Sequence, residues 1–131
     1  ASGPAKDDLA ERRTAWMNAV TRRAQDLGVT IAAGTDSMIG SSPNAWPSLH
    51  DELAALVAAG LTPMQALVSA TGGAARAMAA DGVRGTLEVG KAADLVLLEA
   101  NPLEDIRATR RIRYVVKDGR IVHQAAAGRA R

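Results

Sequence analysis

Residues 29–36, with the sequence VTIAAGTD, constrain the fold of this chain more than any other stretch. A run of apolar and β-branched residues ends at Gly34, and an acidic residue, Asp36, follows two places later. This pattern is typical of a buried parallel strand that delivers one carboxylate to the open end of a sheet or barrel. Because that end carries the catalytic side chains in barrels of alternating strands and helices, we expect Asp36 to belong to a functional site.

The segment before this strand predicts a helix. Asp7 or Asp8 can cap it, and Gly28 is a natural stop directly before the strand. Apolar residues recur within residues 7–27 at the spacing of one helix face: Leu9, Trp16, Met17, Val20, Ala24 and Leu27. A helix, a tight turn and a strand make half of an α/β repeat, so we expect this apolar face to pack in the core.

Further helices are predicted after the strand. Two helix starts carry the residues of a capping box, Ser48 with Asp51 and then Thr62 with Gln65. A pair of glycines at 72–73 breaks the second of these helices, and a short helix follows the break. The first part of the chain is therefore expected to be α/β in character.

From about residue 80 the apolar pattern changes to a period of two, which is typical of strands. We expect extended segments at residues 83–89, 95–98, 112–116 and 121–123, the second of them buried. Asp118 and Gly119 between the last two are a strong hairpin signal. Asp94, just before a strand, is expected to cap a turn through hydrogen bonds to the backbone. The chain thus divides into residues 1–79 and residues 80–131.

The composition excludes several classes of site and partner. The chain has 131 residues and no cysteine, which excludes disulfides, thiolate metal sites and cysteine nucleophiles. No apolar run reaches the length of a membrane span and residues 1–6 do not resemble a signal peptide, so we expect a cytoplasmic protein with no membrane partner. The net charge is +2 and aromatic residues make up 2% of the chain, whereas nucleic-acid binding needs a basic stripe, usually with aromatics. We expect no nucleic acid as partner, and the arginines at 107–113 leave salt-dependent DNA binding as the weakest alternative.

Six short motifs, taken in order, resemble the C-terminal third of metal-dependent amidohydrolases, near the imidazolonepropionase-like and dipeptidase-like branch. They are GTD at 34–36, LHDEL at 49–53, AGLTP at 59–63, GTLEVGKAADLVL at 85–97, NPL at 101–103 and VVKDGR at 115–120. One such motif would be a weak signal, but the order and spacing of all of them make the resemblance specific.

The resemblance implies both a fold and an activity. Residues 1–79 would form the last helix and strand units of a (β/α)8 TIM-like barrel, and residues 80–131 the C-terminal strands of a small β-sandwich domain. The activity would be hydrolysis of a C–N bond in a small amide, a cyclic amide or a dipeptide. Asp36 would contact the metal and carry a proton from the attacking water to the leaving amine. The metal would be one or two Zn²⁺ ions, with other divalent metals as alternatives.

The chain does not contain the whole metal site that the resemblance implies. A catalytic zinc takes about three protein ligands, and the family supplies most of them from histidines that would lie before residue 1. The chain has two histidines, His50 and His123, and neither has a second histidine at ligand spacing. We therefore expect the chain to be inactive alone and to need the N-terminal barrel portion of the same enzyme or a second chain. We also expect a homo-oligomer.

Three further residues are predicted to contact the substrate. Ser37 and Met38 follow Asp36 and would line the mouth of the pocket, although a plain loop role fits them equally. His50 would reach the pocket or orient the loop after Asp36, and its alternative role is a helix residue held by the backbone or by Asp51. For Asp36 the alternative is a helix cap or a loop-stabilising aspartate. For the whole chain it is a catalytically inactive fragment that acts as a structural or binding module.

Overall fold

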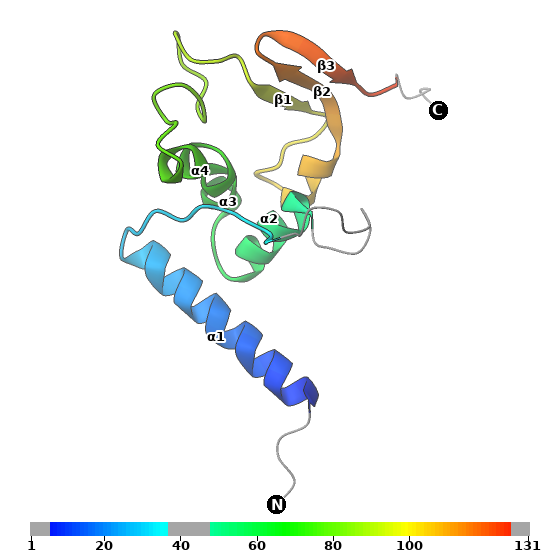
Figure 1. Cartoon of the computed structure of the whole chain (residues 1–131). Coiled ribbons are helices and arrows are strands. Elements are labelled where there is room, and N and C mark those ends of the chain that lie inside the picture. Colours follow the sequence, from blue (N-terminus) through cyan, green and yellow to red (C-terminus); the bar gives the residue numbers. More distant parts are fainter. Residues whose placement is uncertain (1–5, 37–47, 127–131) are drawn as a thin grey trace, which may run out of the picture.

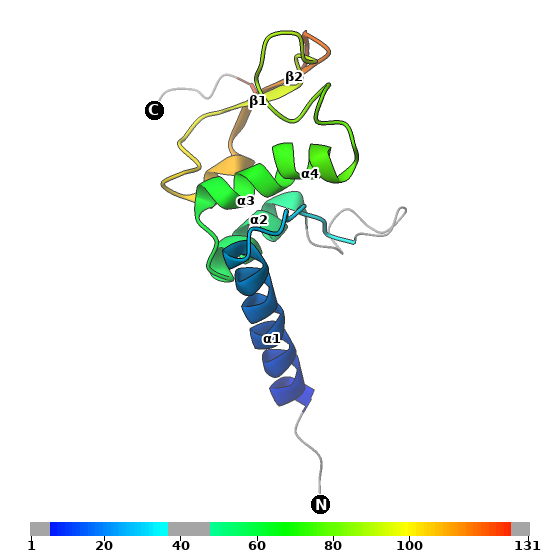
Figure 2. The ribbon, with the colours of Figure 1, turned by 90° about the vertical axis from the view of Figure 1, so that its left-hand side faces the viewer.

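The computed structural model describes residues 6–36 and 48–126 (Figure 1). Its elements in chain order are α1 (Lys6–Asp26), α2 (Leu49–Ala58), α3 (Pro63–Ala70), α4 (Gly72–Ala77), β1 (Leu95–Leu98), the 3-10 helix η1 (Ile106–Arg110), β2 (Ile112–Lys117) and β3 (Arg120–Gln124). Helices α2, α3 and α4 gather in the middle of the molecule, with the strands on one side of them and α1 projecting away on the other (Figures 1 and 2).

The predicted capping boxes are confirmed. The Ser48 side chain accepts from the Asp51 N–H at the start of α2, and the Asp51 carboxylate accepts in return from the Ser48 N–H at 2.8 Å. Thr62 and Gln65 repeat this exchange at the start of α3, where Pro63 occupies the first helical position. Each box satisfies two backbone donors that an uncapped helix start would leave without partners.

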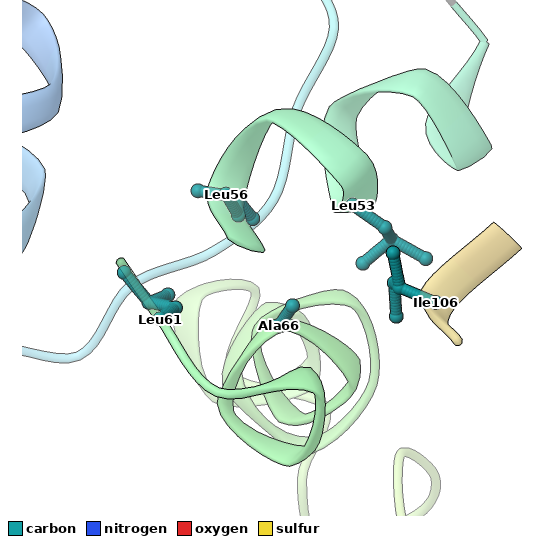
Figure 3. Close-up of a cluster of buried hydrophobic side chains, with 5 residues drawn as sticks. All are labelled: Leu53, Leu56, Leu61, Ala66 and Ile106. Carbon is teal, nitrogen blue, oxygen red and sulfur yellow. The ribbon is translucent and has the colours of Figure 1, made fainter. Parts of the chain in front are cut away.

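The core lies between α2, α3 and η1. Its buried side chains come from these elements and from the turn between α2 and α3: Leu53, Leu56, Leu61, Ala66 and Ile106. Figure 3 shows Leu53 and Ile106 pointing toward each other, so the core joins the first part of the chain to the part after residue 80. Burial of these side chains holds η1 against α2.

The apolar face of α1 is not in this core, contrary to the prediction. Leu9, Trp16, Met17 and Val20 are 53%, 67%, 50% and 48% exposed. The helix contacts the rest of the fold near its last turn, where the Arg22 side chain donates a hydrogen bond to the Ala59 carbonyl. Arg22 lies on the opposite side of α1 from the apolar face by helical spacing, so docking through Arg22 leaves that face exposed.

The predicted strand at residues 29–33 is also wrong for the residues that the structure describes, because this segment pairs with no other strand there. Its contact with the central helices includes one backbone hydrogen bond, from the Ala33 N–H to the Ser69 carbonyl at 3.0 Å. Within the described residues, the N–H groups of Thr30, Ile31 and Ala32 donate no hydrogen bond. A strand needs a ladder partner, and none of the described segments supplies one.

The part after residue 80 follows the prediction more closely. Residues 95–98 form β1, but Val96 and Leu97 are exposed, so the predicted burial is wrong. Residues 83–89 form turns and bends where an extended segment was expected. The hairpin of β2 and β3 is confirmed, with Asp118 and Gly119 both at positive φ, as a two-residue turn of this kind requires.

The described residues form one sheet, three antiparallel strands in the order β1-β2-β3. The expected α/β character of residues 1–79 is not seen among the described residues, which form helices and no strand before residue 80, and a closed barrel or a two-sheet sandwich is not formed by the described residues alone. No helix in the described part of the chain has the length and apolar character to cross a membrane.

Candidate active site

Asp36 lies exposed at the end of the segment that leads away from α1. Its backbone has a φ of 52°, in the left-handed region that aspartate tolerates better than most residues. Its carboxylate makes no hydrogen bond or ion pair with the described residues. Ser37 and Met38, the two substrate-contact candidates that follow it, lie outside the described residues.

A close approach between α4 and this segment holds the segment in place. A Cβ atom on Gly73 would lie 2.6 Å from the Ile31 carbonyl oxygen and 3.0 Å from the Val68 carbonyl oxygen. Only glycine leaves room for these two contacts. Sequence reasoning assigned the glycine pair at 72–73 to a helix break and missed this packing role. Two adjacent glycines in a helical region were the signal that could have indicated a close backbone contact.

His50 contacts neither Asp36 nor Asp51 by a hydrogen bond. Its Nδ1 lies 3.1 Å from the Thr109 hydroxyl oxygen, which joins α2 to η1. Thr109 is 6% exposed, and its hydroxyl also donates to the Ile106 carbonyl at 2.8 Å. The structure therefore gives His50 a side-chain partner far along the chain, which the sequence did not reveal.

Asp51, the neighbour of His50, is occupied by its own hydrogen bonds. The Ser48 N–H and hydroxyl each donate to its carboxylate at 2.8 Å, and Arg110 forms an ion pair with it. These donors, chiefly Ser48 and then Arg110, hold the pKa of Asp51 below its ordinary value. Arg110 belongs to the arginines at 107–113, and Arg111 of the same group pairs with Glu99 at 3.8 Å. Pairing of this kind weakens the alternative of a basic surface for DNA.

Asp94 has the predicted turn-capping role. Its carboxylate accepts the Asp118 N–H at 2.8 Å and the Lys117 ammonium at 3.0 and 3.1 Å. Arg84 lies 3.6 Å away. The backbone N–H of Asp118, followed by Lys117, holds the pKa of Asp94 below its ordinary value. Asp94 thus fixes the β2–β3 turn against the preceding loop.

The described residues do not contain a group of three or more histidine, cysteine, aspartate or glutamate side chains that could hold a metal ion. Asp36 offers one oxygen ligand, and His123 is exposed on β3. A hollow of about 250 Å³ lies between residues 28–31 and α3, but neither Asp36 nor His50 lines it. Asp36 alone does not provide the roughly three protein ligands that a catalytic zinc takes.

Comparison with known proteins identifies relatives of this chain. The sequence signature of the amidohydrolase family matches residues 4–123. The imidazolonepropionase of Geobacillus thermodenitrificans (strain NG80-2) is 39% identical over 104 residues, which are 77% of this chain and 24% of that protein.

Solved structures show the same similarity in three dimensions. A provisionally named prolidase from Bifidobacterium longum superposes with a TM-score of 0.73 and 38% identity, covering 87% of this chain and 28% of that one. A Xaa-Pro dipeptidase with methionine bound in its active site gives a TM-score of 0.69 and 31% identity, covering 82% of this chain and 25% of that one. The chain spans about a quarter of the length of these relatives. Because the family signature matches nearly the whole chain, the chain belongs to the amidohydrolase family.

Proposed function

We propose that this chain supplies Asp36 to the active site of a metal-dependent hydrolase that cleaves C–N bonds. The observation that carries this proposal is the state of the Asp36 carboxylate, which is exposed and without a partner among the described residues. Asp51 and Asp94, by contrast, are each engaged by several donors. A carboxylate without such donors keeps its lone pairs available for a metal ion or a proton.

Asp36 would serve as the general base and then the general acid of the reaction. One carboxylate oxygen would accept that proton as the C–O bond forms, and would then donate it to the nitrogen of the leaving amine as the C–N bond breaks. A bound divalent cation such as Zn²⁺ supplies Lewis acidity, which lowers the pKa of a water and polarises the scissile carbonyl. The packing of Gly73 on Ile31 and the hydrogen bond from Ala33 to Ser69 would keep the carboxylate in place through these steps.

The rest of the site would come from the remainder of the enzyme. Two features support this. The segment at residues 29–33 carries backbone N–H groups without partners in the described part, and the apolar face of α1 is about half exposed. A neighbouring strand and a barrel wall would cover both. Residues 1–79 would then complete a (β/α)8 barrel and residues 80–131 a β-sandwich, with the missing portion on the same polypeptide or a second chain.

The relatives suggest a substrate class. One is named for imidazolonepropionate, a cyclic compound, and another for a dipeptide ending in proline. We propose a small molecule with a hydrolysable amide, cyclic amide or peptide bond. Ser37, Met38 and His50 would line or position the pocket that receives it, with His50 entering from the first turn of α2.

The test is Asp36→Asn in the assembled enzyme. We expect kcat to fall at least about a hundredfold, the usual effect of losing a general acid–base group. Asp26→Asn is the matched control, because Asp26 is the last residue of α1, directly before the segment that leads to Asp36. This variant should keep normal activity. Metal analysis of the assembled protein should find a bound divalent cation. Near-normal turnover of Asp36→Asn, or a metal-free and inactive assembly, would favour the alternative of a structural or binding module.

A further inference from the structure

We propose that Thr109 is a positioning residue that places a hydrogen on Nδ1 of His50, so that the neutral form of the ring is the tautomer with Nε2 as a hydrogen-bond acceptor. The tautomer follows from the contact between α2 and η1. Its consequence for substrate binding rests on the function proposed above for His50.

The tautomer follows from counting hydrogens at the Thr109 hydroxyl. A threonine hydroxyl has one hydrogen to donate and lone pairs to accept with. The Thr109 hydroxyl lies 2.8 Å from the Ile106 carbonyl, an acceptor that has no hydrogen of its own. Once the hydroxyl hydrogen is donated there, the 3.1 Å contact with His50 requires the hydrogen to sit on Nδ1. A neutral imidazole protonated at Nδ1 carries its lone pair on Nε2.

The surroundings of Thr109 favour this arrangement over a freely rotating hydroxyl. Thr109 is 6% exposed, so water has little access to replace either partner. Contacts on both sides hold the two elements together. Asp51 pairs with Arg110 on the polar side, and Leu53 packs with Ile106 in the core. The His50–Thr109 hydrogen bond therefore lies within a fixed junction between α2 and η1.

The consequence concerns what can bind to His50. Nε2 makes no hydrogen bond with the described residues, so it is open to a partner. When the neutral ring carries its hydrogen on Nδ1, that partner must be a donor, such as an N–H group of an amide substrate or of the rest of the enzyme. His50 lies in the first turn of α2, at the point where the described chain resumes after Asp36. Thr109 thus sets the hydrogen-bonding character of His50 from a residue distant in the sequence.

Nitrogen NMR of histidine tests the tautomer directly. This chain would be labelled with ¹⁵N-histidine, and His123→Gln would leave His50 as the only labelled residue. Spectra would be recorded for the chain alone and after assembly with the rest of the enzyme, at a pH where imidazole is neutral. We expect the signals of a ring protonated at Nδ1 and unprotonated at Nε2. A ring protonated at Nε2, or averaging between the two tautomers, would overturn the proposal.

A pair of variants tests the positioning role. Thr109→Val removes the hydroxyl while keeping the shape, and Thr109→Ser keeps the hydroxyl. In the assembled enzyme we expect Thr109→Val to raise KM about tenfold with a smaller change in kcat, the size expected from one hydrogen bond, and Thr109→Ser to restore KM. Thr71→Val is the control, because the Thr71 hydroxyl also donates to a carbonyl of its own helix but has no histidine partner.

Two kinetic results would overturn the positioning role: an unchanged KM in Thr109→Val, or an equal rise in Thr71→Val. The NMR result does not depend on catalysis, so the proposed tautomer can survive when the proposed hydrolase function fails. Conversely, loss of activity in Asp36→Asn combined with a ring protonated at Nε2 would leave the hydrolase function standing and remove the tautomer.

Discussion

The Arg22 guanidinium in α1 donates two hydrogen bonds to the Ala59 carbonyl at the C-terminus of α2, with N···O distances of 3.2 and 3.1 Å. The last carbonyls of a helix have no partner within it, and a cation near them also interacts favourably with the negative end of the helix dipole. Gly60 makes this contact possible. It has a φ of 107°, and a Cβ atom built on it would lie 2.4–2.7 Å from the Arg22 guanidinium.

Gly60→Ala should therefore loosen α1 as well as strain the turn after α2. We expect the free energy of unfolding to fall by about 1–3 kcal/mol, from a non-glycine residue at positive φ and the lost charged hydrogen bonds. Gly82→Ala is the control, because a Cβ there meets nothing within 4 Å. In an Arg22→Met background the Gly60→Ala penalty should shrink, because the displaced partner is already gone. Strictly additive penalties in urea denaturation would contradict the coupling between Arg22 and Gly60.

Gly73→Ala should displace the segment that carries Asp36. The new methyl group would overlap the Ile31 carbonyl, so the segment or α4 must move, at a cost of about 1–3 kcal/mol. Gly72→Ala is a closely matched control in the same helix, because its nearest neighbours would lie at an ordinary 3.6 Å. In the assembled enzyme Gly73→Ala should also lower kcat, through misplacement of the carboxylate. Equal stability and activity of the two variants would contradict the role assigned to Gly73.

The lowered pKa of Asp94 predicts that the free energy of unfolding falls in acid. Its folded-state pKa lies below the ordinary 3.8, so the unfolded chain binds the proton more tightly than the folded chain. Its contribution is present above pH 3.8 and is lost as the pH falls from there through the lowered pKa. Lys117 behaves in the opposite way, because its pKa in the folded state is raised above 10.5. Its contribution to stability is present below pH 10.5 and is lost as the pH rises from there through the raised pKa.

Urea denaturation between pH 6 and pH 2 checks this prediction. The wild-type chain should lose more stability over that range than Asp94→Asn, which has no such proton to bind. Asp81→Asn, in an exposed turn, should follow the wild-type curve. Parallel curves for the wild type and Asp94→Asn would show that the hydrogen bonds to the β2–β3 turn do not stabilise the fold.

Local signals in the sequence were sufficient for several elements of the fold. The capping pairs Ser48–Asp51 and Thr62–Gln65 and the hairpin at Asp118 are encoded within a few residues, and the structure confirms them. The strand at residues 29–33 and the buried face of α1 depend on neighbours that the described residues do not provide. Periodicity showed which side of α1 is apolar, but whether that side is covered depends on what packs against it.

The residues of the candidate site also differ in how far the sequence could predict them. Asp36 could be selected from its place after an apolar run, because that signal is local. The partner of His50 could not, because Thr109 is far along the chain and comes next to α2 through contacts between α2 and η1, such as the packing of Ile106 on Leu53. Spacing rules describe residues on one element, whereas contacts between elements depend on the tertiary fold.

Trp16 provides a direct test of whether the rest of the enzyme covers α1. It is 67% exposed, and Leu9, Met17 and Val20 extend the same apolar face. Trp46→Phe leaves Trp16 as the only tryptophan among these 131 residues. Labelling this chain alone with 7-azatryptophan, which can be excited apart from tryptophan, makes the emission report on that face. On assembly with the N-terminal portion we expect the emission to shift to shorter wavelength and acrylamide quenching to fall, because the indole leaves water.

Variants on opposite sides of α1 decide whether this face drives the assembly. Val20→Asp places a charge within the apolar face and should weaken assembly by at least tenfold, since burying a valine contributes about 1.5–3 kcal/mol. Glu11→Lys changes the charge on the opposite side of the helix by helical spacing and should leave assembly unchanged. If assembly occurs without a shift in Trp16 emission, or if Val20→Asp assembles normally, the apolar face of α1 is not where the remainder of the enzyme packs.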